Sequence, residues 1–209
     1  MAGARRATIR LTDDPDQSHI AETGAVSSTQ RAELELPPAT LDELWNTENL
    51  ERLARAYWRY LNRVSLGSLR VVYEPTARTV VFLVPRLALL RFRAPEYDAQ
   101  GEVASVTWRI ERGLLVARAG RGSGHLRITV RRGGTAASGM ARLAISAEVR
   151  NFYPWLRGSG PLARLGAWVY GQTQMRVHVL VTRGFLRSMA RLDLPPSRVG
   201  LLRGEIEAG

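Results

Sequence analysis

The sequence of 209 residues contains no cysteine, which excludes disulfide bonds, thiol catalysis and thiolate metal ligands. It also lacks lysine, so all 30 of its basic residues are arginine. No apolar run approaches the roughly 18 residues that a membrane-spanning helix needs. The three histidines, His19, His125 and His178, include no pair with the spacing of a metal site. We therefore expect no metal, no cofactor and no transmembrane segment.

The formal net charge is +11, which suits contact with nucleic acid or with an anionic membrane surface. The arginines, however, are scattered through nearly every predicted element and form no basic tract. A GC-rich coding sequence explains the absence of lysine more simply than selection for phosphate binding does. We interpret the charge mainly as a soluble surface. An arginine-rich module that docks to anionic membrane or nucleic acid stays as a rival hypothesis, with peripheral membrane contact ahead of nucleic acid.

The composition, 45% hydrophobic and 23% charged, is ordinary for a globular domain. We expect a single domain over 30–194, a mobile N-terminal tail over 1–29 and a C-terminal tail over 195–209. Residues 8–11 alternate like an edge strand, but the tail is the preferred interpretation. No apolar segment follows the N-terminal arginines, so we expect no signal peptide and, by default, a cytoplasmic protein.

The predicted order begins with a strand and two helices. Apolar and charged residues alternate over Arg31–Leu36, and the proline pair that follows ends this strand. Thr40 and Glu43 have the spacing of a capping box, which predicts a short helix. A second helix from about Thr47 is amphipathic. Its apolar stripe consists of Leu50, Leu53, Ala54, Tyr57 and Leu61.

From Val64 to Val149 apolar residues recur at every second position, which predicts an antiparallel meander of about six strands with one dry face. Residues 94–102 are predicted to be a loop, in which the acids are solvated. Arg112-Gly113 predicts a tight turn into a strand over 114–118. The segment 120–124 has the composition of a phosphate cradle, but it lies between strands and is predicted to be a turn.

The longest predicted helix is Pro161–Leu192, which begins at a proline and ends before Pro195-Pro196. One of its faces is apolar but is broken by the uncharged polar residues Gln172 and Thr182. These two residues either orient a ligand in a cavity or lie at the margins of a core helix. The Phe152–Trp155 aromatic cluster before this helix has a similar pair of interpretations: packing, or contact with a membrane interface or cavity entrance.

The element order resembles that of the START/Bet v 1-like superfamily, also called SRPBCC. The local likeness is best in Val106–Val116 and in Gly122–Val130, and the resemblance covers roughly residues 30–193. It implies an α+β helix-grip fold, in which a strand and two short helices are followed by an antiparallel sheet curved around a long C-terminal helix. It also implies a cavity between the sheet and that helix. Many members bind lipids, sterols, quinones or other apolar ligands, and some are polyketide cyclases or aromatases.

If this fold is correct, the cavity wall combines the dry face of the sheet with the apolar face of the last helix. The same side chains fill a solid core equally well, and the sequence does not distinguish the two. The predicted ligand-binding residues are Tyr73, Phe92, Trp108, Ile128, Trp168, Gln172, Met175 and Val179.

The leading functional hypothesis is non-enzymatic binding or carriage of a hydrophobic small molecule or lipid. We predict no catalytic residue: the sequence has no G-x-S-x-G elbow, and the carboxylates Glu96, Asp98 and Glu102 crowd one loop without a companion histidine. The members of a Ser-His-Asp triad need not be neighbours in sequence, so that arrangement stays open. The alternative is an enzyme of the cyclase or aromatase kind, which needs an ionisable group in the cavity. Tyr73, Arg91 and Arg109 are the candidates for that group.

Overall fold

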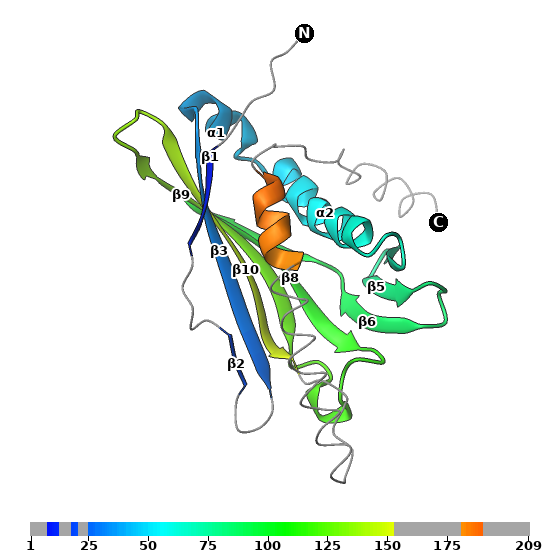
Figure 1. Cartoon of the computed structure of the whole chain (residues 1–209). Helices are drawn as coiled ribbons and strands as arrows, with labels where there is room; N and C mark the ends of the chain where they lie inside the picture. Colours follow the sequence, from blue (N-terminus) through cyan, green and yellow to red (C-terminus); the bar gives the residue numbers. More distant parts are fainter. Residues whose placement is uncertain (1–7, 13–17, 21–24, 153–180, 190–209) are drawn as a thin grey trace.

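The computed structural model describes residues 8–12, 18–20, 25–152 and 181–189. These residues form a large antiparallel sheet with two helices, α1 and α2, and a helical stretch at 181–189 packed against it (Figure 1). The chain is therefore α+β, as predicted. No helix among the described segments is long and apolar enough to cross a membrane.

The sheet has ten strands, and every pair in it is antiparallel. The main path runs β1-β3-β10-β9-β8-β6-β5-β4, while β2 pairs with β3 and β7 pairs with β8. The strands are β1 (Thr8–Thr12), β2 (Ser18–Ile20), β3 (Val26–Leu36), β4 (Leu69–Glu74), β5 (Ala77–Phe82), β6 (Ala88–Arg93), β7 (Glu96–Gln100), β8 (Val103–Arg112), β9 (His125–Thr135) and β10 (Ala141–Phe152).

The N-terminal region differs from the sequence prediction of a tail over 1–29. Within that range β1 and β2 both pair with β3, and β3 itself begins at Val26 instead of Arg31. Short strands at a sheet edge take their hydrogen bonds from a neighbouring strand, so a weak local pattern is enough to form them. The strand ends at Leu36, before the two prolines, as predicted.

The two helices follow directly. Helix α1 (Pro38–Leu44) begins at the second proline of the pair. No side chain caps its N-terminus, so the predicted capping box at Thr40 is wrong. Thr40 lies inside the helix and is buried. Helix α2 (Thr47–Val64) is capped by Asn46, whose side chain accepts a hydrogen bond from the backbone N–H of Asn49 at 2.8 Å. The predicted apolar stripe of α2 faces the sheet, and its members are buried or partly buried.

Between β6 and β9 the structure corrects two predictions. Residues predicted as a loop include β7, which extends the antiparallel sheet along β8. The predicted strand over 114–118 is instead a series of turns that ends in the 3₁₀ helix η1 (Arg118–Gly120). Gly113 explains this change, because its backbone is so close to Leu89 that an added Cβ would lie 2.1 Å from the Leu89 carbonyl oxygen. The chain then turns beside β6 and does not form a hairpin.

The predicted helix Pro161–Leu192 is described only at 181–189, and this stretch is helical. It contributes Phe185, Leu186 and Met189 to the hydrophobic core. The remainder of the predicted helix, Gln172 included, lies outside the described residues, as does most of the aromatic cluster that begins at Phe152.

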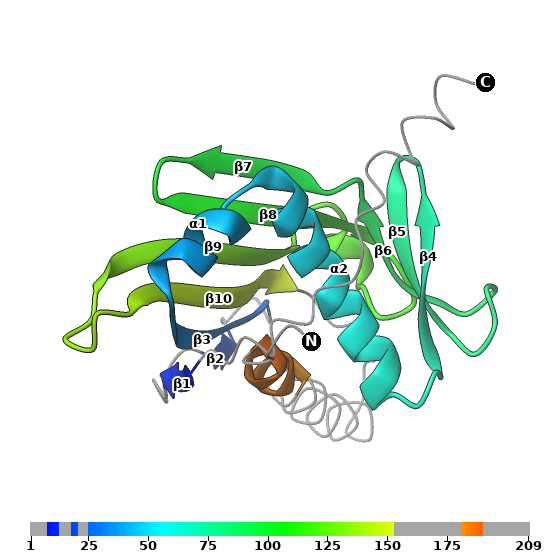
Figure 2. The ribbon, with the colours of Figure 1, turned by 90° about the horizontal axis from the view of Figure 1, so that it is seen from above.

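The centre of the core is a group of aromatic rings around Trp58 of α2. Its ring centroid lies 5.1 Å from that of Trp108 on β8, 5.5 Å from that of Phe92 on β6 and 5.1 Å from that of Tyr57. Tyr57 in turn packs edge-on against Phe185, with the centroids 5.2 Å apart. Figure 2 shows α2 crossing over the sheet, so these contacts join the helix layer to the strands.

We predict that Trp58→Ala lowers the free energy of unfolding by about 3–5 kcal/mol, because it removes a large side chain from the middle of the core. The neighbouring Arg59 is exposed, so Arg59→Ala is the matched control and changes stability by less than about 0.5 kcal/mol. Urea denaturation followed by circular dichroism measures both. Equal effects of the two substitutions would contradict this description of the core.

Candidate functional site

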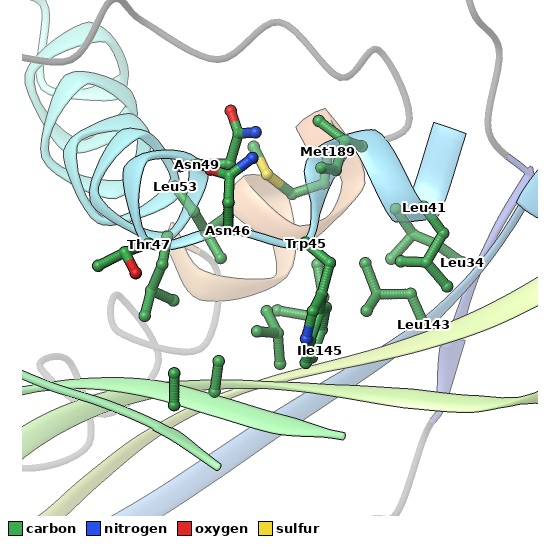
Figure 3. Close-up of a pocket in the computed structure, with 15 residues that line it drawn as sticks. Leu34, Leu41, Trp45, Asn46, Thr47, Asn49, Leu53, Leu143, Ile145 and Met189 are labelled. Atoms are coloured by element: carbon green, nitrogen blue, oxygen red, sulfur yellow. Dashed lines mark hydrogen bonds between the residues drawn. The ribbon is translucent and has the colours of Figure 1, made fainter. Parts of the chain in front are cut away.

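A pocket of about 250 Å³ lies between the two helices and the sheet (Figure 3). Its walls come from α1, the corner between α1 and α2, the first half of α2, five strands and one residue of the stretch 181–189. Most of its side chains are apolar, and the polar ones come from the corner and the start of α2. The lining residues are Leu34, Leu41, Leu44, Trp45, Asn46, Thr47, Asn49, Leu50, Leu53, Ala99, Ala104, Val130, Leu143, Ile145 and Met189.

The helix corner gives the pocket its outer wall. Asn46 fixes the corner, because its side chain accepts from the Asn49 N–H and also donates to the Glu43 carbonyl oxygen at 3.0 Å. In Figure 3 Trp45 extends from the corner toward Ile145 on the sheet, whereas Asn46 and Asn49 point away from the strands. Since Asn46 and Thr47 are exposed, the pocket reaches the surface at this corner.

Arg132 of β9 ties the corner to the sheet. Its guanidinium pairs with the carboxylate of Asp42 on α1, and its Nε lies 3.7 Å from Oε2 of Glu102. Its guanidinium carbon also lies 5.2 Å from the centroid of the Trp45 ring. These contacts connect α1, the turn between β7 and β8, and the tryptophan that lines the pocket.

A polar group, called here the Glu51 cluster, connects α2 with β4, β5 and β7. It consists of Glu51, Arg55, Tyr73, Arg78 and Tyr97. The Glu51 side chain is only 9% exposed. Its Oε1 lies 3.8 Å from the Arg55 Nε, and its Oε2 is buried without a hydrogen-bond partner. The guanidinium carbons of Arg55 and Arg78 lie 5.9 and 5.0 Å from the Tyr73 ring centroid.

The surroundings shift the pKa values of the cluster. Burial raises the pKa of the Tyr97 phenol to about 12, and the charge of Glu51 acts in the same direction. Burial also raises the pKa of Tyr73, although Arg55 opposes this effect. Both phenols therefore remain protonated hydrogen-bond donors at neutral pH. Burial lowers the pKa of Arg78, whose guanidinium also donates to the Ala77 carbonyl oxygen at 2.7 Å.

The Glu51 cluster lies next to the pocket along two elements, α2 and β7. Thr47, Glu51 and Arg55 are spaced four residues apart and so lie on one side of α2. Ala99 and Tyr97 are two residues apart and so face the same side of β7. Because Thr47 and Ala99 line the pocket, the next positions along both elements belong to the Glu51 cluster. An apolar pocket is thus followed by a polar group with a buried carboxylate.

The predicted ligand-binding residues are distributed differently from this pocket. Phe92 and Trp108 belong to the aromatic group around Trp58, and Ile128 is fully buried in the core. Tyr73, expected on the dry face, has 41% of its side chain exposed and belongs to the Glu51 cluster. The other four predictions, Trp168, Gln172, Met175 and Val179, lie outside the described residues.

Thr182, the second polar residue on the predicted helix face, is buried against the protein itself. Its side chain is 0% exposed and is hydrogen-bonded to the Tyr57 hydroxyl. Burial raises the pKa of Tyr57 to about 12, and the hydrogen bond to Thr182 partly opposes this rise. At this position the helix therefore closes the core, which was one of the two interpretations of the sequence.

The arginines proposed as ionisable groups of an enzyme are both engaged in ion pairs. Arg91 pairs with Glu74 at 2.5 Å and with Glu111 at 3.2 Å. Arg109 pairs with Glu96 at 2.7 Å, and this hydrogen bond lowers the pKa of the Glu96 carboxyl. Within the described ranges no three of the histidine, aspartate and glutamate side chains are grouped so as to hold a metal ion.

Sequence reasoning missed the pocket lining at the helix corner. Asn46 precedes the predicted start of the second helix, so its capping role was readable from the sequence. Trp45 and Ala99 carried no comparable signal, because their position depends on how α1 packs over the sheet and on β7. Met189 lies on the predicted apolar helix face, but nothing in that face marked it as part of a pocket.

No family model matches the sequence, and no curated protein matches it. Among solved structures, human STARD10 aligns at 10% identity over 94% of this chain and 76% of its own, with a TM-score of 0.33. Norcoclaurine synthase from Thalictrum flavum aligns at 20% identity over 76% of this chain and 93% of its own, with a TM-score of 0.33. An uncharacterised protein from Rhizobium leguminosarum aligns at 14% identity over 78% and 98%, with a TM-score of 0.29.

We draw no argument about ligand or activity from alignments with TM-scores this low. The described residues have the element order expected from the sequence: a strand, two helices and an antiparallel sheet, with a helical stretch after the last strand.

We predict that Tyr57→Phe lowers the free energy of unfolding at neutral pH by about 1 kcal/mol, because Thr182 loses a buried hydrogen bond. The wild-type protein also loses stability as the pH rises from 10 toward 12, since the unfolded phenol ionises near 10 and the folded one near 12. The substitution removes that contribution. Urea denaturation at increasing alkaline pH measures it, and identical slopes for the two proteins would contradict the assignment.

Proposed function

We propose that the protein binds a hydrophobic small molecule, or one apolar part of a lipid, in the pocket between α1, α2 and the sheet, and acts as its carrier. The observation that carries this proposal is the pocket itself, because protein interiors are close-packed and rarely leave an apolar space larger than a water molecule. This pocket has a volume of about 250 Å³, is lined mainly by apolar side chains and reaches the surface at the helix corner. The fold, which resembles that of START/Bet v 1-like proteins, is consistent with ligand binding in general.

The volume limits the ligand. An apolar cavity of about 150 Å³ accommodates benzene, whereas pockets for drug-sized molecules start at about 300 Å³. The pocket therefore suits a molecule with one or two rings, or a short length of acyl chain. Trp45 supplies a flat apolar surface for it, and Met189 supplies a side chain that adapts its shape.

The polar groups specify where a ligand's polar end lies. Asn46, Thr47 and Asn49 are on the corner, while the Glu51 cluster follows one turn further along α2 and two residues away along β7. A carboxylate oxygen without a partner is costly to bury, and a hydroxyl donor from a ligand would satisfy it. Because Arg55 and Arg78 are both cationic, a neutral hydroxyl fits this position better than an amine.

A second candidate function is acid–base catalysis of the cyclase kind, and the buried carboxylate of Glu51 favours it. In such a step Glu51 takes the proton from a carbon next to a ligand carbonyl group. The Tyr97 hydroxyl donates a hydrogen bond to the carbonyl oxygen, where the negative charge of the enolate gathers. Return of the proton to a different carbon of a conjugated enolate completes an isomerisation that needs no other reactant, whereas its return to the same carbon gives hydrogen exchange with solvent.

We predict that Ala104→Leu weakens apolar ligand binding about ten-fold or more, because the added side chain occupies the pocket. The probe is 2-naphthol, a neutral two-ring molecule with a hydroxyl group, followed by its fluorescence. Native mass spectrometry of protein purified from its own source tests for a co-purifying ligand. Ser105→Leu is the matched control, since Ser105 is adjacent on β8 but faces the opposite side of the sheet.

A second pocket variant tests binding in case Ala104→Leu does not fold. Ala99 lines the pocket from an exposed position on β7, so Ala99→Leu narrows the pocket without disturbing the core and weakens binding in the same direction. The proposal fails if both pocket variants bind the probe as tightly as wild type, or if the Ser105→Leu control loses binding equally.

The catalytic candidate has a separate test. In D₂O the wild-type protein would exchange the acidic C–H protons of small aromatic ketones for deuterium, and Glu51→Gln would slow this exchange by about 100-fold. Proton NMR measures the exchange, and Glu111→Gln is the control because Glu111 lies outside the cluster. Exchange at the rate seen in buffer alone, or exchange that Glu51→Gln does not slow, would contradict the hypothesis that Glu51 is a catalytic base.

A further inference from the structure

At the C-terminal end of α2, large apolar side chains are exposed together on three neighbouring turns. We call this surface the apolar tip. It contains a leucine, Leu66, that is 95% exposed, and a second, Leu83, that is 52% exposed. Scattered single apolar residues are normal on protein surfaces, but a group of this kind marks an interaction site. The residues of the apolar tip are Val64, Leu66, Phe82, Leu83, Val84, Leu87 and Leu114.

Backbone hydrogen bonds hold the three turns next to one another. The Leu83 N–H donates to the Ser68 carbonyl oxygen at 2.8 Å, which links the turn after α2 to the turn between β5 and β6. The Leu114 N–H donates to the Ala88 carbonyl oxygen at 3.0 Å, which adds the turn after β8. Figure 2 shows α2 ending beside β4 and β5 on one side of the molecule. The three turns that carry the apolar tip are therefore neighbours in the fold.

Leu66 and Leu83, the two most exposed residues of the apolar tip, have backbone conformations that are unfavourable for leucine. Leu66 has a φ of 52° and Leu83 a φ of 57°, in the left-handed region that favours glycine or asparagine. A leucine there combines a strained backbone with an apolar side chain in water. Such outliers cluster at functional sites. Both side chains are exposed, Leu66 almost completely.

Within the three chain segments that form the apolar tip, every charged residue is an arginine. The segments 63–70, 82–88 and 112–118 contain Arg63, Arg70, Arg86, Arg112 and Arg118 and no aspartate or glutamate. All five of these arginines are exposed. An arginine can keep its guanidinium in water or at a phosphate while its stem covers apolar surface. The combination of protruding leucines and a rim of arginines is complementary to the headgroups and the acyl chains of an anionic bilayer.

We propose that the apolar tip docks the protein to an anionic lipid surface. Leu66, Leu83 and their neighbours insert between the headgroups, and the rim arginines contact the lipid phosphates. This surface is separate from the pocket: the pocket includes the first turns of α2, whereas the apolar tip begins at Val64, where α2 ends. The docking surface and the ligand pocket can therefore be tested independently.

The test is co-sedimentation with vesicles of phosphatidylcholine alone and with about 30% phosphatidylserine. The wild-type protein binds the anionic vesicles and is released by salt, because screening weakens the arginine contacts. The Leu66→Asn/Leu83→Asn double variant binds at least about ten-fold more weakly. Asparagine tolerates a left-handed backbone, so this variant keeps or raises the melting temperature and its loss of binding is not caused by unfolding.

Two further variants separate the apolar and the charged contributions. Arg63→Glu/Arg86→Glu reduces binding to anionic vesicles, whereas Arg142→Glu, at an exposed arginine of β10, leaves it largely unchanged. Val72→Asn is the apolar control, because Val72 is exposed on β4 but does not belong to the apolar tip.

Since the chain has no cysteine, Leu83→Cys gives a unique site for an environment-sensitive dye. Its fluorescence shifts to the blue on vesicle binding, and that of a dye at Val72→Cys does not. The proposal is overturned if the wild-type protein ignores anionic vesicles, or if the double asparagine variant binds as wild type does. It is also overturned if that variant only changes a monomer–dimer equilibrium, which would make the apolar tip a protein interface.

Discussion

The packing of Trp58 against the sheet is the contact on which the rest of the structure depends. It fixes α2 over β6 and β8, and it fills the space between the layers with aromatic rings. Along the same face of β8, Trp108 lies in this filled region and Ala104 lies in the pocket. The small side chain at Ala104 and the bulk at Trp108 thus decide where the interior is open. Aromatic rings fill the interior beneath the middle of α2, so the space for a ligand lies near the start of this helix.

The two ends of α2 have different chemistry, and this separates the proposed activities. The N-terminal end carries a capped corner, a tryptophan and an apolar pocket, which suit the uptake of a small hydrophobic molecule. The C-terminal end carries protruding leucines with arginines around them, which suit contact with a lipid surface. The Glu51 cluster lies between these ends on the side of the helix that faces β7, and its buried carboxylate is the strongest ionisable candidate for orienting or altering a ligand.

Much of the fold was predictable, because the alternation of apolar residues and the stripe on α2 both depend on local periodicity. The edge strands β2 and β7 were missed, and β1 was assigned to the tail although residues 8–11 alternate like an edge strand. The hydrogen bonds of these strands come from neighbours that the local sequence does not reveal. Trp58 was absent from the predicted stripe although it is the centre of the core. The site was less predictable than the fold: Tyr73 packs against Arg55 and Arg78 and does not line the pocket. The pocket wall at Trp45 and Ala99 forms only when α1 and β7 pack on distant strands.

The central claim is that an apolar ligand enters the pocket at the helix corner, and the methyl group of Met189 tests it most directly. This methionine lines the pocket, whereas Met140 lies in the turn between β9 and β10 and serves as an internal reference. With ¹³C-labelled methionine methyl groups, titration of an apolar ligand should shift the Met189 resonance and leave that of Met140 in place. A ligand that binds while the Met189 resonance stays unchanged would contradict the proposed site.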